Sequence, residues 1–174
     1  MSIRVIAGSA KGRQLKLVPG DSTRPIMDRV KESLFNIIGR DIYDAAFLDL
    51  FAGTGSVGIE ALSRGARYAL LLDIDARAVK TITDNLTLTK LSERATVRKQ
   101  DAFTLLNQPP DQPYDFIYIA PPQYKGLWAT ALQALDARPM WLNGEGQAIV
   151  QIDPTENEAV VLKRLAQTDE RRYG

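Results

Sequence analysis

The sequence predicts a doubly wound α/β fold, in which a mostly parallel sheet carries helices on both faces. From residue 45 onward, apolar stretches of strand length alternate with segments of helical periodicity. Residues 69–72 are apolar at every position, as expected of a strand that is buried on both faces of a parallel sheet. A glycine-rich turn at residues 53–58 separates the first of these strands from the first of these helices, a place where α/β proteins bind ligands.

The elements are expected in a simple order. Residues 3–6 and 15–18 are predicted to form a hairpin inside a basic N-terminal arm, residues 1–25, which is followed by a helix from Met27 to a stop at Gly39. Helices are predicted after the glycine turn as far as Gly65, after a capping Asp75, and over residues 128–135. Strands are predicted at residues 46–51, 68–73, 95–101, 114–120 and 147–152. A length of 174 residues suits one domain, 1–174.

The composition excludes several kinds of chemistry, because the chain contains neither cysteine nor histidine. Without cysteine there is no disulfide, thiolate nucleophile or cysteine-based zinc site, and without histidine there is no Ser-His-Asp triad. Carboxylates, Lys, Tyr, backbone groups or a reactive cofactor must therefore carry any reaction. No apolar run approaches the ~20 residues of a membrane helix, and no signal peptide precedes the first strand, so we expect a cytoplasmic protein.

Positive charge is concentrated at the N-terminal end. Residues 1–40 hold eight basic and three acidic side chains, whereas the remainder holds 14 basic and 18 acidic ones. A basic segment on an otherwise acidic domain is typical of a protein whose one face meets a polyanion. The candidate nucleic-acid contacts in this segment are Arg4, Lys11, Arg13, Lys16, Arg24 and Arg29.

The turn after the first predicted strand, DLFAGTGSVG at residues 49–58, is the most informative motif. Its glycines, Gly53 and Gly55 among them, allow backbone to approach a ligand without an intervening Cβ, and Phe51 lies just before them. The spacing also fits a dinucleotide site, as in an NAD-dependent oxidoreductase. Asp49 argues against that interpretation, because a carboxylate repels a pyrophosphate but attracts an ammonium or a sulfonium. S-adenosyl-L-methionine carries both.

Acidic side chains also end the next two predicted strands. Asp73, 20 residues after Gly53, is placed to accept hydrogen bonds from both ribose hydroxyls of a cofactor, and Ile74 to lie against an adenine ring. Asp101 is placed to accept from the adenine amino group, with Ala102 or Phe103 closing the other face. Because parallel strands end at the same edge of a sheet, the three carboxylates are expected to surround one ligand.

These motifs resemble the ribosomal RNA small-subunit methyltransferase D family over nearly the whole chain. The resemblance rests on DLFAGTGS with GIEALSRGA, on RVIAG, KGR and TRP with DRV in the N-terminal part, and on RRYG at the end. It implies a Rossmann-like class I methyltransferase that uses S-adenosyl-L-methionine to methylate N2 of a guanine in bacterial 16S rRNA. The implied partner is 16S rRNA or the assembling small ribosomal subunit, with Asp49, Gly53, Asp73 and Asp101 at the cofactor. We expect a monomer that needs no metal.

Two departures from the family pattern bear on this expectation. Amino-group methyltransferases of this kind carry Asp/Asn-Pro-Pro-Tyr after the fourth strand, whereas this chain has Ala120, Pro121, Pro122, Gln123 and Tyr124. An acceptor hydrogen-bonded to the guanine amino group makes its nitrogen a better nucleophile, and Ala120 offers none. The Pro121 carbonyl, Gln123 and the stacking ring of Tyr124 remain candidates. The family also continues into a last apolar strand after RRYG, so we expect an incomplete sheet edge.

Three alternatives stay open at this point. A non-catalytic relative would bind cofactor and RNA without transferring a methyl group. A DNA amino-methyltransferase would follow the same chemical logic, and only the N-terminal resemblance disfavours it. An NAD-dependent oxidoreductase fits the glycines but not Asp49 or the Pro-Pro-Gln-Tyr loop.

Overall fold

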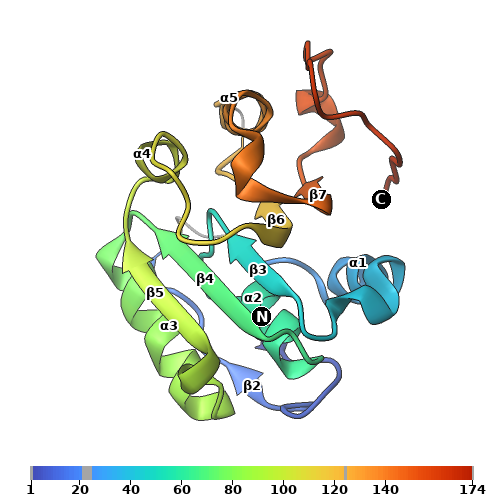
Figure 1. Ribbon diagram of the computed structural model, residues 1–174. Coiled ribbons are helices and arrows are strands. Elements are labelled where there is room, and N and C mark those ends of the chain that lie inside the picture. The colour runs from blue at the N-terminus through green and yellow to red at the C-terminus, as the bar shows by residue number, and fades with distance from the viewer. Residues whose placement is uncertain (1, 21–24, 124, 174) are drawn as a thin grey trace.

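Five parallel strands form the central sheet of the computed structural model, which describes residues 2–20, 25–123 and 125–173 (Figure 1). Their order in the sheet is β5-β4-β3-β6-β7. The strands are β3 (Ala46–Asp49), β4 (Tyr68–Asp73), β5 (Ala95–Lys99), β6 (Tyr114–Ile119) and β7 (Leu142–Val150). The helices are α1 (Asp28–Ile38), α2 (Ser56–Ser63), α3 (Ala76–Thr89), α4 (Ala102–Leu106) and α5 (Leu127–Ala137). The predicted doubly wound α/β class is confirmed.

The helices cover the two faces of the sheet in separate layers. Helices α1, α2 and α3 lie on one face and α4 and α5 on the other (Figure 1). Side chains alternate between the faces along each strand. Phe47 and Leu71 therefore belong to the core under α1–α3, whereas Leu48 and Leu70 belong to the core under α4 and α5. Each core is closed by apolar helix residues, so the central strands β3, β4 and β6 are buried on both sides.

Several predicted strands end one or two residues later than the observed ones, and two larger differences concern α4 and the start of β7. Residues 102–106 form helix α4, which the sequence analysis did not predict. Asp101 caps this helix, and five residues are too few to show a helical period. Strand β7 begins at Leu142 rather than at 147, with an irregularity in its pairing between Tyr114 and Phe116 of β6.

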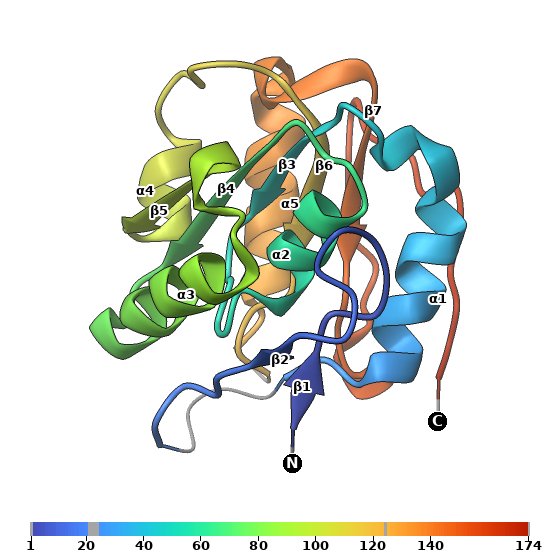
Figure 2. The same ribbon diagram turned by 90° about the horizontal axis from the view of Figure 1, so that it is seen from below.

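The N-terminal arm forms the predicted hairpin, although each strand pairs over only two residues. Strand β1 (Ile3–Arg4) runs antiparallel to β2 (Gln14–Leu15), with Ile3 opposite Leu15. Both of these apolar side chains are buried in the core that α2 covers. Figure 2 shows the hairpin lying beside α2, between α1 and α3. The arm is therefore a packed part of the fold.

The segment after β7 returns along the molecule without regular structure beyond a short turn at Pro154–Glu156. The Asp136 carboxylate, at the end of α5, accepts hydrogen bonds from the backbone N–H groups of Lys163, Arg164 and Leu165, each at 2.8 Å. Ser33 Oγ of α1 and Tyr173 Oη lie 2.5 Å apart, and Figure 2 shows this end running beside α1. Within the described ranges no strand follows β7, which is an edge of the sheet, and no helix is long and apolar enough to cross a bilayer.

Candidate functional site

The sheet reverses its direction of winding between β3 and β6, and this point locates the candidate site. From β3 the chain builds β4 and β5 toward one edge, and β6 and β7 are then added on the other side of β3. The connections diverge here, which leaves room for a ligand at the carboxyl ends of the strands. Asp49 is the last residue of β3, and the Pro-Pro-Gln loop directly follows β6. The two motifs therefore flank one position.

Asp49 is a buried carboxyl group with an unused acceptor. The residue is 1% exposed, and its Oδ1 has no hydrogen-bond partner among the described residues. The pKa of Asp49 is raised to about 7, mainly by burial and also by the nearby charge of Asp73, against the lowering effect of hydrogen bonds from the Phe51 and Gly58 backbone. A buried polar atom without a partner is costly in a folded protein. A cationic ligand group would relieve that cost.

The three glycines of the turn have two different roles. Gly53 and Gly55 have φ angles of 58° and 82°, the left-handed region that favours glycine, and Gly55 is the N-cap of α2. Gly58 lies within α2 and is not among the residues with a positive φ angle. A Cβ at this position would lie 2.7 Å from a Leu71 side-chain atom of β4. The expectation that all three glycines serve ligand approach was wrong for Gly58, which lets helix and sheet pack closely.

Asp73 holds the glycine turn in place. Its Oδ2 accepts a hydrogen bond from Gly53 N at 2.9 Å, and its Oδ1 accepts one from Asp75 N at 2.9 Å. Each carboxylate oxygen has a second lone pair, so the group retains acceptor capacity for a ligand hydroxyl. Ile74 is 63% exposed beside it, and Asp75 caps α3 through Arg77 N at 2.8 Å, as predicted.

Asp101 and the residues around it close the site on the β5 side. Asp101 Oδ2 accepts from Thr104 N at 2.9 Å and thereby caps α4. Ala102 is only 2% exposed and offers almost no surface to a ligand. The neighbouring Phe103 is half-buried and meets Phe51 edge to face, with ring centroids 6.2 Å apart. The two rings, rather than Ala102, offer the apolar surface next to Asp101.

The loop after β6 presents fewer polar groups than the family pattern requires. Ala120, Pro121 and Gln123 are half-buried and Pro122 is exposed, whereas Tyr124 lies outside the described residues. Sequence analysis missed Gln151, which follows β7 and donates its N–H to Ile119 O at 3.0 Å. The side-chain oxygen of Gln151 accepts a hydrogen bond from the hydroxyl group of Tyr118.

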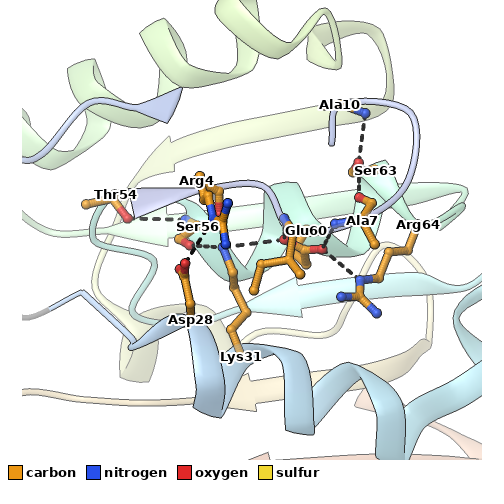
Figure 3. A network of polar contacts seen from close by, with 11 residues as sticks. Arg4, Ala7, Ala10, Asp28, Lys31, Thr54, Ser56, Glu60, Ser63 and Arg64 are labelled. Atoms are coloured by element: carbon orange, nitrogen blue, oxygen red, sulfur yellow. Dashed lines mark hydrogen bonds and ion pairs between the residues drawn. The ribbon is translucent and has the colours of Figure 1, made fainter. Parts of the chain in front are cut away.

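Two buried side chains connect the N-terminal arm to the glycine turn. Lys31 is fully buried and donates from Nζ to Arg4 O at 2.6 Å and to Ser56 Oγ at 2.8 Å (Figure 3). Asn85, also fully buried, accepts from Lys16 N at 2.8 Å and donates to Thr54 O at 2.9 Å. A single side chain therefore connects Arg4 of β1 to Ser56, and another connects Lys16, which follows β2, to Thr54. Thr54 and Ser56 are the two neighbours of Gly55.

Glu60 completes this network from the centre of α2. Its carboxylate accepts from Ile6 N at 2.9 Å and Ala7 N at 3.0 Å, and lies 3.4 Å from Lys31 Nζ and 2.7 Å from Arg64 Nε (Figure 3). Burial lowers the pKa of Lys31, and the charge of Glu60 opposes that effect. Lys31 thus contributes nothing to the exposed charge of the N-terminal segment, although it was counted among the basic residues there.

The predicted nucleic-acid contacts fall into two groups along the arm. Lys11 and Arg13 are exposed on the hairpin turn, which Ser63 at the end of α2 holds through Ser9 N and Ala10 N. The others lie nearer the glycine turn: Arg4 pairs with Asp28 at 3.1 Å, Lys16 lies 3.6 Å from Asp84, Arg29 is in the first turn of α1, and Arg24 is outside the described residues. Exposed ion pairs of this kind contribute only about 0–1 kcal/mol to stability, so their basic side chains can bind phosphate at little cost.

The sheet order, the switch point at Asp49 and the glycine turn define a Rossmann-like fold of the methyltransferase class. A family model described as "Conserved hypothetical protein 95" matches residues 3–174. The chain belongs to this family, and the resemblance to ribosomal RNA small-subunit methyltransferase D proteins that its motifs indicated is confirmed.

Individual relatives support the same grouping. The chain is 39% identical to "Putative rRNA methyltransferase YlbH" of Bacillus subtilis, over 99% of this chain and 94% of that one. It is 35% identical to "Ribosomal RNA small subunit methyltransferase D" of Haemophilus influenzae, over 91% and 82%. The solved structure of "Putative methyltransferase yhhF from Escherichia coli" superposes with a TM-score of 0.80 at 35% identity, over 92% and 86%.

Proposed function

We propose that the protein transfers a methyl group from S-adenosyl-L-methionine to N2 of a guanine in 16S rRNA, in the cytoplasm where small subunits are assembled. The observation that carries the cofactor assignment is the Asp49 carboxyl group, buried beside the glycine turn with Oδ1 unpartnered within the described ranges. A cationic ligand group suits this acceptor, whereas the pyrophosphate of a dinucleotide would be repelled. The names of the relatives support rRNA as the substrate class.

The residues present fit such a cofactor. Asp49 would hold its ammonium group, Asp73 its ribose hydroxyls and Asp101 its adenine amino group, with Ile74, Phe51 and Phe103 against the ring. The sulfonium methyl is already activated toward a nitrogen nucleophile, so the protein has only to orient the guanine and accept its N–H hydrogen bonds. The backbone at Gly53 and Gly55 would lie close to the ligand because these residues have no side chain.

The guanine would be held by the loop after β6. In our proposal the Pro121 carbonyl accepts one amino hydrogen, and Gln123 supplies an amide oxygen where Ala120 has no acceptor. This carbonyl lies between the rings of Pro121 and Pro122, which limit the motion of the loop and would keep the carbonyl oriented toward the base. Tyr124 is proposed to stack on the extruded base.

Transfer of tritium from labelled S-adenosyl-L-methionine to undermethylated 30S particles tests the proposal. Digestion of the labelled rRNA should yield radioactive N2-methylguanosine. Radioactivity in another nucleoside would refute the guanine assignment, and tight NADH binding without binding of S-adenosylhomocysteine would refute the methyltransferase assignment.

One observation favours a second function, that of a non-catalytic RNA-binding relative. Ala120 occupies the position of the usual carboxylate or amide, and loss of one preorganised acceptor typically costs about 10²–10³ in rate. A chain that binds both cofactor and 30S particles but transfers no label in single-turnover conditions would have this second function.

A further inference from the structure

A hollow of about 500 Å³ lies at the edge of the sheet opposite the candidate cofactor site. It is bordered by the end of α1, by the following turn Gly39–Ile42, by the end of α2 and by Gly8 and Ser9 of the arm. Tyr43, in its wall, precedes β3, and Gly65 follows α2 before β4 begins. The hollow is therefore at the amino ends of the strands, and its volume is within the ~300–1,000 Å³ of ligand sites.

The most informative side chain in its wall is Arg64. This side chain is 15% exposed, its guanidinium carbon lies 5.1 Å from the Phe35 ring centroid, and its Nε donates to Glu60 at 2.7 Å. Neither terminal nitrogen has a hydrogen-bond partner within the part of the chain that the structure describes. Figure 3 shows these nitrogens turned away from Glu60. A fixed guanidinium thus offers unused donors to the hollow.

The other polar and aromatic groups in the wall extend this chemistry. Tyr43 is 70% exposed, an unusual state for an aromatic ring, and its ring packs over Gly65. Arg40 and Asn36 are exposed and also line the hollow. Together they offer a stacking surface, amide and guanidinium groups that can bond a base edge, and a cation for a phosphate.

The charge around the hollow suits a polyanion. Lys11 and Arg13 lie on the hairpin turn that Ser63 docks at the end of α2. The acidic side chains next to the lining residues Arg40 and Tyr43 are Asp41 and Asp44, and Asp44 lies 3.9 Å from Arg67, which partly neutralises it. The hollow is therefore contiguous with the exposed basic part of the arm.

We propose that this hollow binds one unstacked nucleotide of the RNA substrate, as an anchoring subsite separate from the site of methyl transfer. The base stacks on Tyr43, its edge receives hydrogen bonds from Arg64 and Asn36, and Arg40 contacts a phosphate. Proteins read RNA mostly at unstacked nucleotides of this kind. The eight residues of α2 span about 12 Å, so the subsite and the glycine turn lie at the two ends of one short helix. The inference rests on the proposed function only in taking RNA as the substrate.

Binding of the full-length chain to undermethylated 30S particles tests the proposal. Tyr43→Ala and Arg40→Glu should each weaken binding about tenfold, near the lower end of what stacking aromatics contribute. Tyr43→Phe, which keeps the ring, should restore the loss seen in Tyr43→Ala. Lys163→Glu is the matched charge control, because its exposed side chain lies on the segment held by α5. Affinity for S-adenosylhomocysteine should stay at the wild-type level in Tyr43→Ala, which shows that this variant is folded.

The same experiment separates failure of the inference from failure of the proposed function. Wild-type affinity in both Tyr43→Ala and Arg40→Glu, from a chain that binds and methylates 30S particles, overturns the anchoring subsite alone. If the wild-type chain binds no RNA, both proposals fall. Benzoylphenylalanine at position 43 identifies the occupant: a crosslink to 16S rRNA supports the proposal, and crosslinks to ribosomal protein alone overturn it.

Discussion

Cofactor affinity should depend on pH through the ionisation of Asp49. The pKa of this carboxyl group is raised to about 7 because it is buried, so the free protein holds it largely protonated below neutral pH. Only the ionised form attracts a cationic ligand. The apparent affinity equals the intrinsic affinity multiplied by the fraction of the protein in which Asp49 is ionised. That fraction is about 3% at pH 5.5 and about half at pH 7, so affinity should rise roughly fifteenfold across this range.

Calorimetry with S-adenosylhomocysteine at several pH values between 5.5 and 7 measures this effect. The ligand ammonium stays protonated in this window, since amino groups of this type titrate near ~7.7–8.0. At pH 5.5 binding should release nearly one proton per ligand, which buffers of different ionisation enthalpy reveal. Asp49→Asn should weaken binding at pH 7 and flatten the profile, whereas Asp73→Asn should weaken binding and keep a slope.

Two results would refute this reasoning. One is a flat profile in the wild-type chain, and the other is an unchanged slope in Asp49→Asn. Stability supplies an independent check of the sign. The folded pKa is raised, so protonation favours the folded state, and the stability of the free protein should fall as pH rises from about 4 to 7. Asp49→Asn should therefore stabilise the free protein at pH 8, by at most about 4 kcal/mol.

Three further predictions concern the loop after β6, the buried network and the glycine turn. If Gln123 has taken over the acceptor role, Gln123→Ala should lower the rate of single-turnover methyl transfer by about 10²–10³, and Ala120→Asp should change it little. If the loop simply lacks one acceptor, Ala120→Asp should raise the rate. Lys31→Met leaves Glu60 buried with fewer partners and should lower the free energy of unfolding in urea by about 3 kcal/mol. Gly58→Ala places a Cβ 2.7 Å from a Leu71 side-chain atom and should lower the free energy of unfolding by about 1–3 kcal/mol in the same assay.

Each of these predictions has a control within the chain. For Lys31→Met it is Lys80→Met, since Lys80 is exposed and its pair with Asp84 should be worth less than about 1 kcal/mol. For Gly58→Ala it is Gly144→Ala, where no atom lies within 4 Å of the added Cβ. An equal loss of unfolding free energy in Lys31→Met and Lys80→Met would contradict the role assigned to burial of the ion pair. An equal loss in Gly58→Ala and Gly144→Ala would contradict the role assigned to close packing. For the loop variants, unchanged cofactor affinity is required before a rate is interpreted.

The centre of the sheet was predictable because β3, β4 and β6 are largely apolar runs, each bounded by a polar strand end or a turn. The candidate cofactor carboxylates followed from the same property, since parallel strands end at one edge of a sheet and Asp49, Asp73 and Asp101 come at or just after three such ends. The first part of β7 was missed because residues 143–146, NGEG, have no strand-like pattern. Leu142 pairs with Tyr114 and Gln147 with Phe116 of β6, so residues 143–146 lie in an irregular stretch of the strand, and a single sequence carries no signal of it.

The buried network was beyond sequence reasoning for a different reason. Lys31 and Glu60 are two of many charged residues on predicted helices, and such residues are almost always exposed. Only the packing of the arm against α2 places the pair away from solvent, and the partners are far apart in the chain. Tyr43 was missed likewise, because a single aromatic residue between Ile42 and Asp44 belongs to no motif, and the exposure of its ring is known only from the structure.

The docking of the arm onto Glu60 also has a consequence for synthesis of the protein. Ile6 and its acceptor are 54 residues apart, so at about 5–20 residues per second the arm is made about 3 to 11 s before its partner helix. During that interval the Ile6 and Ala7 N–H groups have no Glu60 carboxylate to bond. A deletion of the first seven residues would remove these two donors from the Glu60 carboxylate. A tag is therefore better placed at the C-terminus, where it leaves both of these hydrogen bonds intact.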